Sequence, residues 1–379
     1  MNLKKLSKAA ILLLVTLVLA SCSMALVPQT FDTFDIHTPD QASYLAAVDF
    51  SSPHKYGAKG TAENSHPLSP VFSWSCKGGL KAKSCTLFVA DNPQMEDALQ
   101  YIVNPDDTTF TCVMNLMANT SYWWKLEVTA QDGNVISTEP SCFTTLSGPR
   151  NLEIDGITNV RDMGGYATSD GKVVKQGLIF RTGCYNEKYT TNLTITETGL
   201  EQMRNLGIRT EIDLRGDKNT SVNQLYANGY PTDGSIAMES PLGSDVNYVF
   251  VPTKWNNLLM SDETGRIMVR RVFEVLSDPS NYPVAFHCTI GTDRTGACAF
   301  LIGCALGMSD TDLIHDYLFS NFASIGGNRT MTDFTNAMRP IISMPGDTYA
   351  KKGVNYLLDI GVSETQIQAL RAIMLETLD

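Results

Sequence analysis

The sequence predicts a multidomain protein in which a small N-terminal β-sandwich precedes an α/β domain with a mostly parallel central sheet flanked by helices. Apolar residues alternate with polar ones before residue 147, and strand-like and helix-like segments alternate after residue 150. The stretch Ser147–Arg150 contains Gly and Pro, which interrupt both patterns. A chain of 379 residues also suits two domains of roughly 100–200 residues each. The predicted domains therefore span residues 67–147 and 150–379.

The composition is that of a folded globular protein. Hydrophobic residues make up 43% of the chain and charged residues 18%, which excludes a disordered chain. The formal net charge is -11, whereas a protein that binds nucleic acid normally presents a basic surface. Nucleic acid is therefore not an expected partner.

The N-terminus has the features of an export signal. Three lysines within the first eight residues precede an apolar run over residues 9–20, which is short for a membrane span. The run ends in Leu19-Ala20-Ser21-Cys22, which resembles the lipobox of bacterial lipoproteins. This resemblance implies that residues 1–21 are removed and that Cys22 carries a lipid anchor. We expect an exported protein held on the periplasmic face or the cell surface of a bacterial membrane; a plain secretory signal is the alternative.

Residues 22–66 show no clear period and are predicted to be a tether. From residue 67 onward short strands are expected, most clearly over 121–130, where large apolar and polar side chains alternate. Asp132-Gly133 then supplies a hairpin turn. The segments 116–125 and 142–145 resemble the last strands of fibronectin type III-like domains. Such a domain is expected to act as a spacer or as a docking module for a partner.

Export would place the cysteines of the first domain in an oxidising compartment. Four cysteines admit three disulfide pairings, and the alternative is that they are small core residues. Both interpretations stay open for Cys76, Cys85, Cys112 and Cys142.

The second domain is predicted from alternating strands and helices, which imply a mostly parallel sheet. Strands are expected over residues 178–181, 208–214 and 282–287, and helices over 196–206, 263–276, 294–308 and 364–378. The polar stretch 216–262 is long for a connection and is a candidate lid or substrate loop.

Residues 283–296 carry the strongest chemical pattern of the chain. An apolar strand leads through a tight loop into a helix, so that unpaired backbone amides and the positive end of the helix dipole meet at one place. This environment lowers the pKa of a cysteine, and Cys288 is therefore a candidate nucleophile. Arg294 offers a planar fork for two phosphoryl oxygens. Gly291 permits the turn, and Thr295 can donate a hydrogen bond to the sulfur.

The motif His287-Cys288-x-x-Gly291-x-x-Arg294-Thr295-Gly296 matches the phosphate loop of the Cys-dependent tyrosine phosphatase superfamily. Together with the segments 159–166, 180–183, 213–215 and 315–321, it resembles a bacterial tyrosine phosphatase family whose loop reads H-C-x-x-G-K-D-R-T-G. The resemblance covers residues 150–379 and implies an α/β phosphatase fold, a phosphocysteine intermediate, and no metal or cofactor. It implies a phosphate-binding loop formed by Cys288, Thr289, Ile290, Gly291, Thr292, Asp293 and Arg294, supported by His287, Arg161, Asp162 and Asp213.

The resemblance implies activity on phosphotyrosine, with phosphoserine, phosphothreonine or phosphoinositides accepted by some members. Thr292 stands where the family loop has Lys, and the missing charge favours a phosphoprotein or a small phosphate monoester over inositol phosphates. An inositol-phosphate phosphatase and a non-catalytic exported phosphate-binding protein are the alternatives. The family favours Asp293 as the general acid; its alternative is a carboxylate that stabilises the helix N-terminus. Asp162 is the second candidate, although a structural role in its turn is favoured.

Overall fold

The computed structural model divides the chain into two compact units. The expected signal peptide and Cys22 lie outside the described residues, as does most of the stretch 216–262. The structure describes residues 24–50, 53–186, 194–215, 239–253, 263–325 and 327–377.

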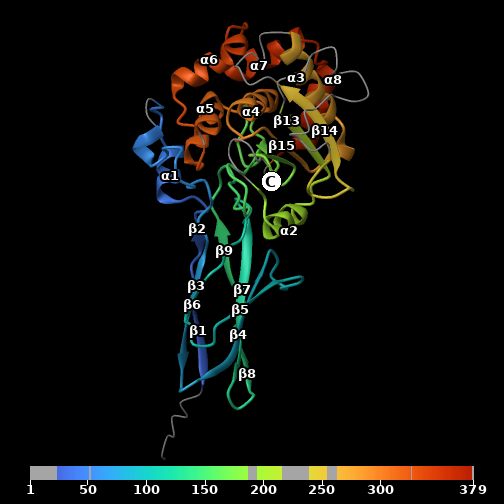
Figure 1. Cartoon of the computed structure of the whole chain (residues 1–379). Coiled ribbons are helices and arrows are strands. Elements are labelled where there is room, and N and C mark those ends of the chain that lie inside the picture. Colours follow the sequence, from blue (N-terminus) through green and yellow to red (C-terminus); the bar gives the residue numbers. More distant parts are fainter. Residues whose placement is uncertain are drawn as a thin grey trace, which may run out of the picture. The chain divides into compact units, whose positions relative to one another are not determined.

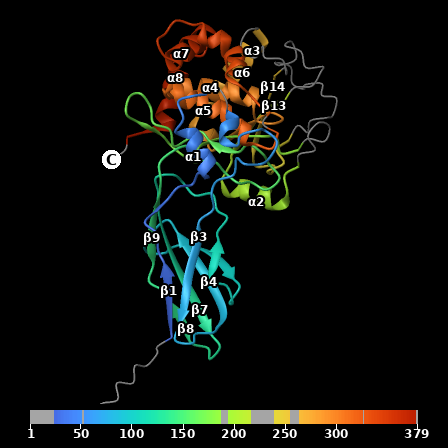
Figure 2. The same ribbon diagram turned by 90° about the vertical axis from the view of Figure 1, so that its left-hand side faces the viewer.

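The first unit is rich in β-structure, as expected, and comprises residues 24–30, Val71–Phe110 and Trp123–Ser141. Strands β1, β3 and β6 form one sheet; β7, β4 and β5 lie in that order in another, and β8 pairs with β7 (Figures 1 and 2). The strands are β1 (Ala25–Gln29), β3 (Val71–Lys77), β4 (Ala82–Ala90), β5 (Leu99–Val103), β6 (Thr109–Thr111), β7 (Ser121–Ala130) and β8 (Val135–Ser137).

The alternation that predicts a strand over 121–130 is confirmed along β7. Every second residue is buried from Tyr122 to Ala130, and the intervening ones are partly exposed. Trp124 is fully buried, and its ring packs 4.8 Å from that of Phe72 on β3. One face of the strand therefore supplies the core of the unit.

Cys76, Cys85, Cys112 and Cys142 are all free cysteines in the structure, so none of the three possible disulfide pairings is formed. Cys85 and Cys112 are buried, which agrees with the core alternative, whereas Cys76 and Cys142 are exposed. Burial raises the pKa of the Cys85 thiol to about 11, with a smaller contribution from Cys76.

The second unit contains the predicted α/β domain. Its central sheet has the order β10-β12-β15-β13-β14, in which only β10 runs antiparallel to its neighbour. The four parallel strands are β12 (Ile179–Thr182), β15 (Val284–His287), β13 (Thr210–Arg215) and β14 (Asn247–Thr253), and β10 spans Arg161–Asp162. Part of the candidate lid is thus strand β14 at the edge of the sheet.

Helices surround this sheet (Figure 1). The predicted helices are α2 (Glu197–Asn205), α3 (Glu263–Leu276), α4 (Asp293–Leu306) and α8 (Glu364–Met374). Gly207 (φ 70°) and Gly307 (φ 83°) follow the ends of α2 and α4 in the left-handed conformation that favours glycine. The unit further contains α5 (Asp310–Leu318), α6 (Met331–Ile342), α7 (Tyr349–Asp359), η3 (Pro279–Asn281), η4 (Phe319–Phe322), and the paired strands β2 (Thr33–Phe34) with β9 (Ser141–Thr145) and β11 (Val173–Val174) with β16 (Leu375–Glu376).

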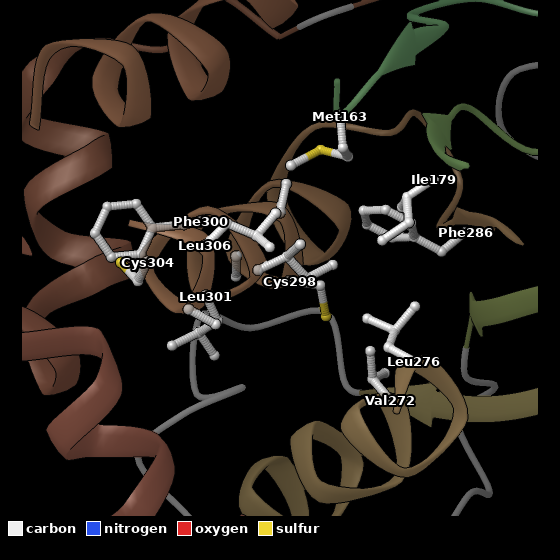
Figure 3. Close-up of a cluster of buried hydrophobic side chains, with 14 of the residues drawn as sticks. Met163, Ile179, Val272, Leu276, Phe286, Cys298, Phe300, Leu301, Cys304 and Leu306 are labelled. Atoms are coloured by element: carbon white, nitrogen blue, oxygen red, sulfur yellow. The ribbon is translucent and has the colours of Figure 1, made fainter. Parts of the chain in front are cut away.

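Both faces of the sheet are buried, as parallel sheets require. Successive strand residues enter two different cores: Ile179 and Phe286 join the cluster formed with α3 and α4, while Phe180 and Ala285 join the one that contains Met203 of α2. Figure 3 shows the first cluster, in which side chains of α4 face α3 and the sheet. The sheet therefore holds the end of β15 rigidly between two packed layers.

The tether expected over residues 22–66 is instead largely folded. From Phe31 onward this segment belongs to the second unit, where it forms α1 (Pro39–Leu45) and the short helix η1 (Pro53–Tyr56). Thr38 and Gln41 cap α1 reciprocally. Tyr44 is only 1% exposed, and its hydroxyl donates a hydrogen bond to the carbonyl of His315. A seven-residue helix is too short to give a clear period in the sequence, and tertiary packing stabilises it.

The unit boundaries also differ from the single predicted boundary near residue 148. Residues 31–70, 111–122 and 142 onward all belong to the second unit. Among the described residues, no helix is long and apolar enough to cross a membrane.

Candidate active site

The predicted phosphate loop lies where β15 passes into α4. Cys288 directly follows β15 and is 2% exposed, and α4 begins at Asp293. Gly291 has φ 73°, and a Cβ atom there would lie 2.6 Å from the carbonyl oxygen of Thr182. Both the backbone conformation and the close approach of β12 therefore require glycine at this position.

Four consecutive carbonyl groups of the loop each accept a hydrogen bond from a different donor. The carbonyl of Cys288 accepts from His287 Nδ1 (3.1 Å), that of Thr289 from the Cys184 amide (3.0 Å), that of Ile290 from Asn159 Nδ2 (3.1 Å) and that of Gly291 from Arg181 Nη2 (2.8 Å). These donors come from several segments of the second unit. Each carbonyl group from Cys288 to Gly291 is therefore fixed by a hydrogen bond to the surrounding protein.

These contacts fix the direction of the loop amides. In a trans peptide the carbonyl and the N–H that follows it point to opposite sides. Because the carbonyls from Cys288 to Gly291 face the surrounding protein, the amides of residues 289–292 face away from those donors. Successive amides directed to one side, next to a helix N-terminus, form a binding site for an anion.

The pKa of Cys288 sets it apart from the other buried thiols. Burial opposes ionisation of Cys288, but the charge of Arg294, the hydroxyl and amide of Thr295 and the amide of Gly291 outweigh it and lower the pKa below its ordinary value. Burial raises the pKa of Cys298 to about 12, and that of Cys304 well above its ordinary value. A thiolate is thus favoured at Cys288 and opposed at two equally buried cysteines.

Arg294 lies on the first turn of α4 and is 5% exposed. Its Nη2 donates to the hydroxyl of Thr289 (3.0 Å) and its Nη1 to the carbonyl of Leu214 at 3.3 Å. The guanidinium is therefore fixed beside the loop. This is the arrangement expected of a group that holds phosphoryl oxygens.

Two buried arginines lie behind the loop and share one carboxylate. Arg161 and Arg181 both pair with Asp316 of α5, and Arg161 also donates to the Asp316 carbonyl at 2.9 Å. Burial and the neighbouring charge of Arg181 lower the pKa of Arg161 to about 10, so it is still a cation at neutral pH. Two cations and one anion leave a net positive charge behind the anion site. Asp316 belongs to the segment 315–321 noted in the sequence, although its role could not be derived there.

His287 is fully buried in a cluster of charged residues. Its Nε2 lies 2.9 Å from the Glu211 carboxylate, and its Nδ1 lies 3.1 Å from the Cys288 carbonyl and 3.8 Å from Asp213. Both near partners are acceptors, so both ring nitrogens act as donors. Burial lowers the pKa of His287, but Asp213 and Glu211 outweigh it and hold the pKa above its ordinary value. His287 therefore holds the Cys288 carbonyl of the loop, and Glu211 is a supporting residue that sequence reasoning missed.

Glu211, Asp213 and His287 are also close enough together to be considered as metal ligands. Their atoms are already engaged, however. Arg215 donates from Nε and Nη2 to both oxygens of Asp213, and Tyr248 donates to Asp213 at 2.8 Å. The cluster is a set of ion pairs, in which Asp213 pairs with Arg215.

Asp162 occupies a structural position. Its carboxylate accepts hydrogen bonds from Arg150 (3.1 Å) and from the amides of Gly164 and Gly177 (2.8 and 2.6 Å). Burial raises its pKa despite Arg150. None of these partners belongs to the phosphate loop, so the geometry favours the structural role over catalysis.

Asp293 is paired with a residue that the sequence did not single out. Arg329 donates from Nε to one oxygen (2.7 Å) and from Nη2 to the other (2.6 Å), and the Tyr317 hydroxyl lies 3.4 Å from the first. Arg329 is 36 residues away, and no local pattern marks it.

A cavity of about 680 Å³ lies elsewhere in the second unit, lined by segments that include Met117–Thr120 and Lys175–Gln176. No residue of the phosphate loop lines it. The hydrogen bonds that orient the loop and the lowered pKa of Cys288 bear directly on chemistry. We therefore take the loop, and not this cavity, as the candidate active site.

The fold and the loop together define an α/β domain in which a buried thiol of lowered pKa lies in a candidate anion-binding loop. The model of the tyrosine phosphatase family matches residues 152–376, well over half of the chain. The chain therefore belongs to the tyrosine phosphatase family. Membership of this family supports phosphatase activity, and a phosphatase is a hydrolase.

Individual proteins that match this chain share 14% to 25% sequence identity with it. A provisionally named tyrosine-protein phosphatase of Cupriavidus necator is 25% identical over 232 residues, which cover 55% of this chain and 76% of the relative. The core catalytic domain of the PP-IP phosphatase Siw14 of S. cerevisiae, solved with citrate, has 14% identity and a TM-score of 0.28 over 46% of this chain and 84% of its own. A second structure of the Siw14 catalytic core also has 14% identity and a TM-score of 0.28, and covers 47% and 88%.

Proposed function

We propose that this protein hydrolyses phosphate monoesters, with protein phosphotyrosine as the main substrate class, through a phosphocysteine intermediate on Cys288. The observation that carries the proposal is the lowered pKa of a fully buried thiol inside a loop whose amides are directed to one side. Burial alone would raise that pKa, as it does for Cys298. An environment that stabilises a thiolate also suits a phosphate dianion.

The proposed reaction has two steps. The Cys288 thiolate attacks phosphorus, a P–S bond forms, the P–O bond to the alcohol or phenol breaks, and the leaving oxygen takes up a proton. Water then attacks phosphorus and gives up one proton, which balances the proton taken up by the leaving oxygen; the P–S bond breaks and inorganic phosphate leaves, while the electron pair returns to the sulfur. Arg294 and the loop amides stabilise the negative charge of both transition states. Thr295 stabilises the sulfur when it departs as a thiolate.

The charge of the chain supports a monoester substrate. Thr292 replaces the Lys of the family loop, and the net charge of -11 does not attract polyanions over long distances. A phosphotyrosyl group needs the loop and Arg294 only. Hydrolysis rates for phosphotyrosine, phosphoserine and phosphothreonine peptides and for inositol phosphates test this preference. Faster turnover of inositol phosphates would contradict it.

Turnover itself is tested with p-nitrophenyl phosphate. We expect hydrolysis that EDTA does not affect and vanadate inhibits. Cys288→Ser and Arg294→Ala should abolish it, while each variant keeps the thermal stability of the parent. Undiminished turnover by Cys288→Ser would refute the mechanism. Retained phosphopeptide binding without turnover by the parent protein would instead favour the phosphate-binding alternative.

We further infer that the protein is an exported lipoprotein whose β-rich unit is a fibronectin type III-like spacer or docking module. The support is the sequence alone: the basic and apolar N-terminus, the lipobox-like Leu19–Cys22, and the strand pattern of residues 67–147. Palmitate labelling at Cys22 and accumulation of the precursor with globomycin are expected. Unlabelled protein of unchanged size would contradict the anchor.

A further inference from the structure

We propose that Asp293 and Arg329 form a clamp that positions the start of α4, and with it Arg294, and that Asp293 is not the proton donor to the leaving group. This inference rests on the proposed phosphatase function. It assigns a positioning role to Arg329, and it departs from the role that the family resemblance implies for Asp293.

The pairing occupies the whole carboxylate. The two oxygens of Asp293 each accept one hydrogen bond from the same guanidinium, at 2.7 and 2.6 Å. This fork-to-carboxylate geometry needs both oxygens as acceptors. A protonated Asp293 would have to give up one of these bonds before it could donate a proton. The side chains are 17% and 21% exposed, so the pair is largely shielded from water.

Further contacts surround the pair. The Tyr317 hydroxyl adds a donor at 3.4 Å from Asp293, and Asp293 raises the pKa of Arg329, chiefly through their hydrogen bonds. Asp333 acts in the same direction from the first turn of α6. Asp293 and Asp333 thus both favour the charged form of Arg329.

The backbone of Arg329 is held by the side chain of Asn321. Its backbone amide donates to Asn321 Oδ1 (2.5 Å), and Asn321 Nδ2 donates to its carbonyl (2.9 Å). The carbonyl of Asn321 in turn accepts from the amide of Gly60 (2.6 Å). The guanidinium is therefore presented to the loop by a fixed backbone.

The segment around Gly60 makes a second connection to the site. The Glu63 carboxylate accepts from the Thr158 hydroxyl (2.5 Å) and from the amide of Ser324 (3.2 Å). Thr158 precedes Asn159, which holds the Ile290 carbonyl of the loop. The N-terminal part of the second unit thus contacts Asn321, which holds Arg329, and Thr158, which precedes the residue that holds the loop.

The clamp acts on the reaction through Arg294. Asp293 is the first residue of α4 and directly precedes Arg294, so fixing its carboxylate fixes the first turn of the helix. Arg294 must be oriented to place two donors on the phosphoryl oxygens. Loss of the clamp should weaken oxyanion binding and turnover without a particular effect on leaving-group protonation.

Leaving-group dependence separates a clamp from an acid. We would measure kcat/KM for p-nitrophenyl phosphate, whose leaving group needs little protonation, and for phenyl phosphate, whose leaving group needs more. Asp293→Asn, Arg329→Gln and the double variant should each lower both values by a similar factor of roughly ten to a hundred. The double variant should be no worse than the single ones, because both remove the same interaction. Arg329→Lys, which keeps one charged donor, should recover part of the loss.

Two measurements do not depend on turnover. The rate of Cys288 alkylation by iodoacetamide at neutral pH and the affinity for vanadate should both fall in Arg329→Gln. The matched control is Arg339→Gln, which removes an exposed guanidinium of α6 that bonds only Asn336 among the described residues. It should leave all four measurements unchanged.

The proposal is overturned if Asp293→Asn slows phenyl phosphate about a hundredfold more than p-nitrophenyl phosphate while Arg329→Gln affects both equally, since that is the pattern of a lost general acid. It is also overturned if Arg329→Gln leaves alkylation and vanadate affinity unchanged. If the parent protein hydrolyses neither substrate but the alkylation and vanadate results hold, the clamp stands and the proposed function fails.

Discussion

Arg181 connects the phosphate loop to the buried carboxylate of Asp316. Its Nη2 donates to the Gly291 carbonyl at 2.8 Å, and its Nη1 pairs with Asp316. Gly291 has the left-handed backbone that the loop needs, and the contact with Arg181 holds its carbonyl away from the anion site. A residue on β12 thereby sets the direction of the Thr292 amide.

Arg181→Gln should therefore weaken oxyanion binding. The substitution leaves the Gly291 carbonyl and one oxygen of the Asp316 carboxylate without a charged donor. Unsatisfied buried groups of this kind cost about 1–3 kcal/mol. We expect the inhibition constant of vanadate to rise by about tenfold or more. Arg271→Gln, which removes an exposed arginine paired with Glu274, is the control and should leave it unchanged. Equal vanadate affinity in Arg181→Gln and the parent would refute the role of Arg181.

Thr295→Ala should raise the pKa of Cys288. Burial favours the thiol, and the hydroxyl of Thr295 is one of the groups that overcome it after the charge of Arg294. At a given pH below the new pKa a smaller fraction is thiolate, so the pH profile of iodoacetamide alkylation should move to higher pH. An unshifted profile would show that the hydroxyl does not stabilise the sulfur.

His287→Gln should change how stability depends on pH. Burial opposes the imidazolium, but Asp213 and Glu211 raise the pKa of His287 above its ordinary value. A group whose pKa is raised by folding contributes stability that is complete below its unfolded pKa, about 6.5, and is lost as the pH rises through the folded pKa. The free energy of unfolding of the parent should therefore exceed that of the variant most at acidic pH. If the difference in free energy of unfolding between the parent and the variant instead grows toward alkaline pH, Asp213 and Glu211 do not stabilise His287 as a cation.

Tyr44→Ala tests whether residues 31–66 belong to the catalytic unit. Tyr44 is buried against His315 and Phe322, with ring centroids 4.8 and 5.5 Å away. Truncating a buried aromatic side chain costs roughly 3–5 kcal/mol of unfolding free energy. Val48→Ala, at a site 85% exposed, should cost almost nothing. Chemical denaturation of both variants measures the difference, and a tether would show no loss for Tyr44→Ala.

The phosphate loop and the parallel sheet could be predicted because their signals are local. Cys288, Gly291 and Arg294 stand within seven consecutive residues, and the strand before them is a continuous apolar run. The alternation along β7 is equally local, and the structure confirms its buried face. Patterns of this kind depend on periodicity and turn chemistry, which a sequence displays directly.

The partners of the loop could not be predicted, because they come from distant parts of the chain. Arg329 meets Asp293 across 36 residues, and Glu211 meets His287 across 76. Tyr44 reaches His315 across 271 residues, which is why the segment around it resembles a tether in the sequence. Nothing local distinguishes a buried ion pair from two surface charges, so these residues emerge only from the fold.

Cys288 carries the phosphoryl group during turnover in the mechanism that we propose. The most direct measurement is mass spectrometry of the protein after acid quenching during steady-state hydrolysis of p-nitrophenyl phosphate. We expect the mass of one phosphoryl group on the peptide that contains Cys288, and none in Cys288→Ser. Continued hydrolysis with no phosphorylated Cys288 peptide, or with the group on another residue, would contradict the mechanism.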